Sequence, residues 1–275
     1  MSTRLIVLKL GGELIEESAR LQVVVAAIAR ISSFGIPLVI VHGGGREIDA
    51  ALKSAGIETR QVEGLRITDE RTLDIVVSVL AGAVNARIVA ALTAAGVGAV
   101  GLTGADGHVG LCRIAPPHRS VEGRLVDLGR VGVPVEDADV RLLDTLVSNR
   151  FVPVVASIGA DETGRLLNVN ADTLGGHLAG RLHARRLVIA GTTAGVLGAD
   201  GATVPLLDSN AVAQLVADRT ATSGMIAKLR ACEHALARGV EDVVIVDGRD
   251  GSALEAAATG ATAKNATRLV LTVQV

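Results

Sequence analysis

The sequence predicts an α/β protein, built as a three-layer α/β/α sandwich around a central, mostly parallel sheet. Short runs rich in Val and Ile recur along the chain between longer helix-like stretches. The runs are apolar on both faces, as strands covered by helices on both sides are. Strand and helix alternate, which is the order of a doubly wound sheet. The predicted strands are residues 5–10, 37–41, 99–102, 152–156, 187–190, 243–246 and 269–273.

The segment before the fourth predicted strand differs from the rest. Residues 108–134 hold Gly, Pro and short alternating pieces such as residues 123–133, which predict β-hairpins at the sheet edge or over a cleft. Upstream, residues 88–105 carry no charge over 18 positions, a length at the lower edge of a membrane span. Because glycines interrupt this stretch, a helix over residues 88–95 and a strand over residues 99–102 are the better interpretation.

Composition narrows the function classes. The chain has 275 residues, 49% hydrophobic and 20% charged, which predicts a packed globule of one large domain or two lobes. Only Phe34 and Phe151 are aromatic, and the net charge is -2 without a basic cluster. Nucleic-acid binding needs stacking platforms or many phosphate contacts, so we expect no nucleic-acid partner. Small-molecule chemistry remains.

The cysteines and the N-terminus indicate the compartment. Cys112 and Cys232 have neither the number nor the spacing of a disulfide framework or a metal motif. The first apolar run, residues 5–8, ends at Lys9 and is too short for a signal peptide. We therefore expect a cytoplasmic protein without a membrane segment.

Two glycine-rich loops follow predicted strands. Lys9-Leu-Gly11-Gly12 ends the first strand, and His42-Gly-Gly44-Gly45 ends the second, just before a helix. Ligands of open parallel sheets bind at strand ends, and glycine N–H groups at a helix start favour anions. The loops therefore predict an anion site, although glycines that only make tight turns are the alternative. The G-x-G-x-x-G of residues 96–101 lies in the wrong helix-to-strand order for a dinucleotide loop, and no Walker or nucleophile-elbow motif is present.

Lysine is scarce in this chain. Only four of the 27 basic residues are lysine, and two of them, Lys9 and Lys228, lie at glycine-rich positions. Lysine is a compact point charge, whereas arginine is a planar fork. The pattern indicates that both sites require a compact cation, while Lys53 and Lys264 have the character of solvated surface. His42 is interpreted as structural, because no second metal-ligating residue lies near it in sequence.

Five motifs taken in order carry a resemblance. They are Lys9-Leu-Gly-Gly12, His42-Gly-Gly-Gly45, Gly64-Leu-Arg66-Ile-Thr68-Asp69, Asn168-Val-Asn170-Ala-Asp172 and Gly224-Met-Ile-Ala-Lys228. In this order the chain resembles the acetylglutamate kinases of the amino-acid kinase family, from residue 5 to about 248. The resemblance implies that family's fold, with an acyl-amino-acid lobe and dimer interface over residues 1–185 and a nucleotide lobe over residues 186–275. It also implies ATP-dependent phosphorylation of the side-chain carboxylate of N-acetyl-L-glutamate, in arginine biosynthesis.

The resemblance also implies roles for individual residues. Lys9 and Lys228 would contact the transferring phosphoryl group from the acceptor and nucleotide sides, held by Asp172. Gly11 and Gly12 would bind phosphate, and ATP would carry the Mg²⁺, with no metal site on the protein. The acceptor would bind through Gly44, Gly45, Arg66 and Asn168, and the nucleotide through Thr192, Gly195, Leu197, Gly224 and Met225. Taken singly, Arg66 could be a surface ion pair, Asn168 a turn former and Asp172 a helix-start acid.

Three departures from the family pattern lie in the expected nucleotide lobe. Thr192 stands where an aspartate is expected, Ser223 where glycine or aspartate is usual, and Ala266-Thr267 replaces Gly-Thr. They put nucleotide affinity or choice in doubt. Two alternatives therefore stay open, a kinase for N-acyl-2-aminoadipate or N-succinylglutamate and a non-catalytic amino-acid-binding regulator. The arginine-sensing elements of the family are not evident, so we expect a homodimer without arginine feedback.

Overall fold

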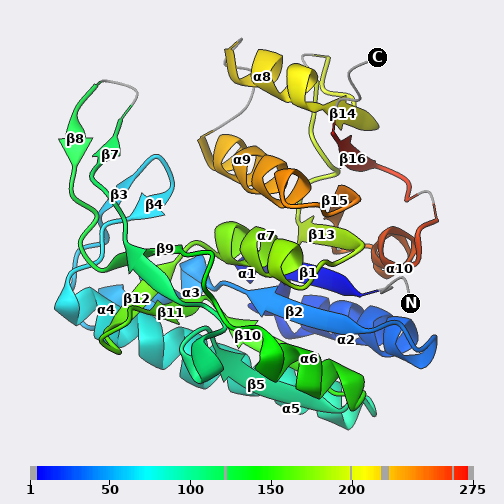
Figure 1. Ribbon diagram of the computed structural model, residues 1–275, viewed down its shortest axis with the longest axis horizontal. Coiled ribbons are helices and arrows are strands. Elements are labelled where there is room, and N and C mark those ends of the chain that lie inside the picture. The colour runs from blue at the N-terminus through cyan, green and yellow to red at the C-terminus, as the bar shows by residue number, and fades with distance from the viewer. Residues whose placement is uncertain (1–4, 121–122, 199, 218–222, 262, 272–275) are drawn as a thin grey trace.

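A computed structural model describes all residues except 1–4, 121–122, 199, 218–222, 262 and 272–275. The core is an eight-stranded sheet in the order β14-β16-β15-β13-β1-β2-β10-β5 (Figure 1). Its strands are β1 (Ile6–Leu10), β2 (Leu38–His42), β5 (Ala99–Thr103), β10 (Val152–Ala156), β13 (Arg186–Gly191), β14 (Leu206–Asp208), β15 (Asp242–Asp247) and β16 (Ala266–Val270).

The sheet is parallel from β5 through β15, and β16 runs antiparallel to β15. β1 lies at its centre, between β13 and β2, and all five of its residues are buried. A strand buried on both faces is mostly apolar, which is why the sequence predicts a strand at residues 5–10. The predicted strands other than the last are confirmed to within a residue or two.

The last predicted strand is misplaced. The prediction followed the apolar residues 269–273, whereas β16 spans Ala266–Val270 and residues 272–275 lie outside the described chain. In β16, Thr267 and Leu269 are buried and Arg268 is exposed. The strand therefore alternates between a buried and an exposed face, so a search for a continuous apolar run misses its first residues. The short neighbouring strand β14 was missed altogether.

Helices cover both faces of the sheet (Figure 1). α2 (Ser18–Ser33), α5 (Asn85–Ala94) and α10 (Gly251–Thr259) pack with Ile6 and Leu8 in one core. α6 (Arg141–Ser148), α7 (Ala171–Arg181) and α9 (Ser223–Ala237) pack with Val7 on the other face, and α8 (Ser209–Ala217) contacts β14 and α9. Side chains of a strand alternate between faces, so Lys9 points to the α7 side with Val7.

One long helix is apolar enough to be tested as a membrane span. α4 (Glu70–Val77), a π-helical segment η1 (Ser78–Val84) and α5 together run from Glu70 to Ala94, 25 residues. Its Leu73, Val76, Leu80, Val84, Ile88 and Leu92 are buried in the protein. The helix thus covers the core, and a single such helix is weak support for a membrane span. The predicted helix and strand over residues 88–102 are confirmed as α5 and β5.

The middle of the chain forms hairpins, as predicted for residues 108–134. η2 (Asp106–His108) leads into β6 (Cys112–Ile114), which joins β9 (Val131–Pro134), β12 (Leu166–Val169) and β11 (Ile158–Ala160) in a second sheet. Two hairpins, β3 (Gln61–Val62) with β4 (Leu65–Arg66) and β7 (His118–Arg119) with β8 (Leu125–Val126), project together (Figure 1). The two hairpins are connected by a contact of 2.9 Å between His118 Nε2 and Glu63 Oε2.

Candidate active site

The two glycine-rich loops meet at the carboxyl ends of β1 and β2. They lead into α1 (Gly12–Ile15) and α3 (Gly45–Ser54). A Cβ at Gly12 would lie 3.0 Å from the Gly44 Cα and 3.2 Å from the Gly45 nitrogen, so the loops touch backbone to backbone. A Cβ at Gly44 would lie 2.9 Å from Leu80 of the π-helical segment. Side chains at Gly12 and Gly44 would thus be crowded. The first-turn N–H groups of the two helices lack intrahelical partners and are available to an anion.

The two glycines of the first loop differ in their backbone donors. The Gly11 N–H donates to the Ala190 carbonyl oxygen at 2.9 Å, which ties the end of β1 to β13. Gly12 is the first residue of α1, where backbone N–H groups point out of the helix. Gly12 is therefore the donor of this loop that can face a phosphoryl group, while Gly11 gives the close backbone approach.

Lys9, Asp172 and Lys228 come together at the same end of the sheet. The Lys9 Nζ lies 2.9 Å from Asp172 Oδ1, and the Lys228 Nζ lies 3.6 Å from Asp172 Oδ2. All three side chains are at most 16% exposed. Lys9 extends from β1 beneath Gly175 of α7, where a Cβ would be 3.4 Å from the Lys9 Cβ. The structure thus groups the three residues that the resemblance predicted as catalytic.

The start of α7 fixes Asp172. Asn170 caps the helix, and its side-chain oxygen accepts hydrogen bonds from the N–H groups of Asp172 at 2.9 Å and Thr173 at 3.1 Å. Burial raises the pKa of Asp172, but the charges of Lys9 and Lys228 outweigh it and hold the pKa below its ordinary value. Burial and the like charge of Lys9 lower the pKa of Lys228, against the raising effect of Asp172. One carboxylate therefore holds two ammonium groups that each keep N–H donors to spare.

Arg66 lies next to the second glycine loop. Its Nη2 donates to the Gly45 carbonyl oxygen at 3.3 Å, and its Nη1 is 2.7 Å from Asp49 Oδ1 without the alignment of a hydrogen bond. The Arg66 side chain is only 8% exposed, whereas that of Asp49 is 43% exposed, so the ion pair is buried on the arginine side. The Arg66 guanidinium therefore keeps N–H donors that can bind a carboxylate beside the second glycine loop.

Asn168 connects to Arg66 through a buried threonine. The Asn168 side-chain amide donates to Thr68 Oγ1 at 3.1 Å, and that hydroxyl donates to the Arg66 carbonyl oxygen at 3.1 Å. Asn168 lies in β12, so it is not a turn former. The structure thus links these two predicted acceptor residues, and Thr68 is the connecting residue that sequence reasoning did not assign.

His42 is structural, as expected. Its ring is fully buried, and burial lowers its pKa to about 4. Nδ1 lies 3.0 Å from the Gly43 carbonyl oxygen and Nε2 lies 3.0 Å from the Asn85 side-chain nitrogen. Asn85 also donates to the Val154 carbonyl oxygen at 2.9 Å. With these partners a neutral ring donates from Nδ1 and accepts at Nε2, an assignment made from the hydrogen-bond network.

The residues predicted to bind the nucleotide lie in two segments. Gly195 is left-handed (φ 73°), and the turn around it is held by Thr267, whose hydroxyl accepts from the Val196 N–H at 2.7 Å. Thr192 is half-buried just after β13, and Leu197 is 47% exposed. Thr267 has a buried structural role, so the Ala266-Thr267 departure keeps the hydroxyl that holds this turn.

The second segment is the start of α9. Gly224 is exposed and Met225 is half-buried, and the side chain of Ser223 lies outside the description. The Gly64 turn between β3 and β4 approaches it, since a Cβ at Gly64 would lie 4.0 Å from the Gly224 Cα. Segments that the resemblance assigns to acceptor and nucleotide therefore face each other across the site.

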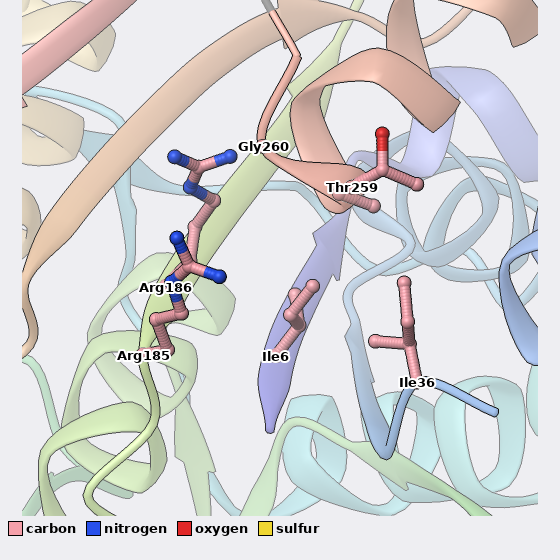
Figure 2. Close-up of a pocket in the computed structure, with 7 residues that line it drawn as sticks. Ile6, Ile36, Arg185, Arg186, Thr259 and Gly260 are labelled. Atoms are coloured by element: carbon pink, nitrogen blue, oxygen red, sulfur yellow. The ribbon is translucent and has the colours of Figure 1, made fainter. Parts of the chain in front are cut away.

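A cavity of about 240 Å³ lies at the other end of the sheet (Figure 2). Arg185 and Arg186 line one side of it, and Ile6 and Ile36 line the other. These residues are at the amino ends of β1 and β13, whereas open parallel sheets bind ligands at the carboxyl ends. We therefore place the site at the glycine loops. Within the described chain no three His, Cys, Asp or Glu side chains are grouped to hold a metal ion.

Comparison with known proteins decides the family. The sequence profile described as the amino acid kinase family matches residues 4–247. The chain belongs to the amino acid kinase family. It is 40% identical to the acetylglutamate kinase of Nostoc punctiforme over 254 residues, 91% of this chain and 82% of that protein. It is 41% identical to the acetylglutamate kinase of Acidiphilium cryptum over 248 residues, 89% and 83% of the two chains.

Solved structures support the same fold for this family member. A protein of Streptococcus mutans is similar with a TM-score of 0.78 and 28% identity, over 89% of this chain and 95% of the other. The N-acetylglutamate synthase of Neisseria gonorrhoeae has a TM-score of 0.84 at 24% identity, over 99% and 61%. The predicted α/β/α fold and the resemblance to acetylglutamate kinases are confirmed.

Proposed function

We propose that this amino acid kinase transfers the γ-phosphoryl group of ATP to the side-chain carboxylate of N-acetyl-L-glutamate. The observation that carries the proposal is the Lys9–Asp172–Lys228 group beside two touching glycine loops. The 40% identity to acetylglutamate kinases supports this choice of acceptor. The place in arginine biosynthesis is part of the same proposal.

The reaction joins two anions and needs no general base. A glutamate side chain has an ordinary pKa of about 4.3, so the attacking carboxylate is ionised at neutral pH. One of its oxygens bonds to the γ-phosphorus while the bond from that phosphorus to the bridging oxygen of ADP breaks. Catalysis is therefore alignment and charge neutralisation. Lys9 and Lys228 supply positive charge on the two sides of the group, and Asp172 keeps both ammonium groups in place.

The remaining site residues hold the substrates in line. Arg66 clamps the acceptor's α-carboxylate beside Gly45, with Asn168 attached through Thr68. Gly12, Gly44 and Gly45 provide backbone donors where no Cβ intervenes. On the nucleotide side, Thr192, Gly195, Leu197, Gly224 and Met225 stay predictions. Mg²⁺ would be carried by the phosphates of ATP and would neutralise part of their charge.

A coupled ADP-release assay with hydroxylamine trapping of the acyl phosphate tests the function. We expect product with ATP and N-acetyl-L-glutamate and none without acceptor. N-acyl-2-aminoadipate and N-succinylglutamate are compared by kcat/KM, because one methylene in a pocket is worth only about 1–3 kcal/mol. No turnover with any acyl amino acid contradicts the proposal, and calorimetry showing amino-acid binding without ATP binding favours a non-catalytic regulator.

We also propose a homodimer without arginine feedback, in a reducing cytoplasm. The long helix Glu70–Ala94 exposes Gly82, Ala83, Ala86 and Ala90 next to the edge strand β5, a surface that suits a second copy. Cys112 and Cys232 are both free and buried. The division at residue 185 into acyl-amino-acid and nucleotide lobes belongs to the same proposal, and residue 185 falls just before β13. A hexamer in light scattering contradicts the homodimer, and inhibition by arginine contradicts the absence of arginine feedback.

A further inference from the structure

Glu13 places a carboxylate inside the first glycine loop. It is the second residue of α1, and its side chain folds back over Gly11. A Cβ at Gly11 would lie 2.7 to 2.8 Å from the three carboxyl atoms of Glu13. A Cβ at Gly191 would lie 3.4 Å from Glu13 Oε1. The carboxylate therefore occupies the space that two missing side chains leave between the ends of β1 and β13.

Within the part of the chain that the structure describes, this carboxylate has no ion-pair partner. Among the described residues no hydrogen bond or ion pair joins the Glu13 carboxylate to another side chain, whereas Asp172 is taken up by Lys9 and Lys228. Glu13 is half-buried, so its side chain keeps access to solvent at the ends of β1 and β13. Its negative charge reaches Lys228 and adds to the fields of Asp172 and Cys232 that raise the pKa of that lysine against burial.

A free carboxylate here is unfavourable for a phosphate site unless a cation accompanies the phosphate. Two like charges that are close together in a partly buried site repel more strongly than they do in water. Mg²⁺ bound to nucleotides is held by one or two carboxylates together with phosphate oxygens and waters. Thr192, next to Gly191, is neutral, and Asp172 has no oxygen to spare. Asp247, beside Gly191 at the end of β15, is paired with Arg249 at 2.6 Å. Glu13 is thus the carboxylate at these strand ends that the described residues leave without an ion-pair partner.

We propose that Glu13 binds the Mg²⁺ ion of the metal–nucleotide complex, directly or through one of its waters, at the ends of β1 and β13. This inference rests on the proposed use of ATP. It makes Glu13 a discriminator between free and metal-bound nucleotide. Without the ion the carboxylate repels the phosphates, and with the ion it attracts them.

The test is binding, independent of turnover. Mn²⁺ is used as the paramagnetic probe, and its dissociation constant from the protein–ADP complex is measured by electron paramagnetic resonance. For Glu13→Gln, which keeps the shape and removes the charge, we expect Mn²⁺ affinity about tenfold weaker, the lower end of the range for groups that orient a bound metal. Calorimetry of metal-free ADP should show equal or tighter binding, because the repulsion is gone.

Two further variants complete the design. Glu16→Gln removes a charge at the end of the same short helix, where Glu16 is 3.7 Å from Arg46, and should leave both affinities unchanged. Glu13→Asp keeps the charge and should recover part of the Mn²⁺ affinity. Unchanged Mn²⁺ affinity in folded Glu13→Gln, or an equal loss in Glu16→Gln, overturns the proposal. Wild-type protein that fails to bind ADP with Mn²⁺ rejects the proposed nucleotide use itself, whereas normal binding without phosphorylation of any acceptor rejects only the proposed reaction.

Discussion

The two ends of the central sheet each bury an aspartate between two cations, with opposite results. At the carboxyl end, Asp172 lies 2.9 and 3.6 Å from two lysines. At the amino end, Asp242 of β15 receives both arms of the Arg186 fork, at 2.6 Å each, and Arg268 at 2.8 Å. The third Arg186 nitrogen donates to the Ala257 carbonyl oxygen at 2.6 Å. The amino-end group is thus closed, while the carboxyl-end group keeps free donors.

The difference teaches how the same charges can serve structure or chemistry. An arginine fork matches a carboxylate in shape and saturates it, whereas a lysine ammonium is a point charge with three donors that can turn to a second partner. The pKa of Asp242 is lowered by the Arg186 and Arg268 guanidinium groups, against burial that raises it. We call the carboxyl end with its free donors the open end and the amino end the closed end. Of the four lysines among the 27 basic residues, two lie at the open end.

The largest expected effect comes from making the open end resemble the closed one. Lys9→Arg keeps the charge but puts a planar fork against Asp172, beneath Gly175. We expect kcat to fall by about 10² to 10³, the loss typical of removing one preorganised donor from a transition state. Steady-state kinetics measure this, with the exposed Lys53→Arg as the control. Near-normal turnover would remove Lys9 from the chemistry.

Breaking the closed end should cost stability and spare turnover. Asp242→Asn leaves the buried Arg186 without its counter-ion. We expect the free energy of unfolding to drop by about 3 kcal/mol, as when one partner of a buried pair is removed. Urea denaturation measures this, and the kcat of the folded fraction should stay unchanged. Asp137→Asn, at an exposed position, is the matched control, and an equal loss there would contradict the assignment.

Moderate acid should leave both aspartates ionised but should lower the free energy of unfolding, because His42 beside Gly43 is buried neutral and is protonated when the chain unfolds. The pKa values of Asp172 and Asp242 are lowered, so both stay ionised at pH 5. His42 has its pKa lowered from 6.5 to about 4, so its stability contribution is full above pH 6.5 and is lost as pH falls toward 4. We expect this loss to lower the free energy of unfolding by about 2 kcal/mol at pH 5. Unfolding at pH 7 and pH 5 should show a smaller drop in His42→Gln and an unchanged one in the exposed His234→Gln.

The smallest effect should separate binding from chemistry within the open end. Arg66→Lys removes the fork beside Gly45 and keeps a charge. We expect KM for the acyl amino acid to rise about tenfold with kcat unchanged, because the clamp holds the acceptor equally in ground and transition states. Initial rates over a range of acceptor concentrations measure it. If kcat falls and KM stays, Arg66 acts on the reacting group.

Sequence predicted the sheet and the lysine loops because each leaves a local pattern. β1 begins with an apolar run, and Lys9 near its end precedes two glycines by two residues. β16 was misplaced because it alternates, and β14 was missed because three residues carry too little signal. The contacts of Asp242 with Arg186 and Arg268 join residues far apart in the chain, so they could not be predicted. Glu13 was also missed, since its folding back over Gly11 depends on the tertiary path of the loop, although its place after a glycine pair was a visible signal.

The contact between Gly12 and Gly44 has one more consequence. Since the loops meet through main-chain atoms alone, no side chain between them can change rotamer and absorb a displacement. A shift of one loop therefore displaces the other, so the proposed acceptor and phosphate sites move together as one rigid unit. An alanine at Gly12 would push the two loops apart and misalign both substrates. A higher substrate concentration would not restore kcat.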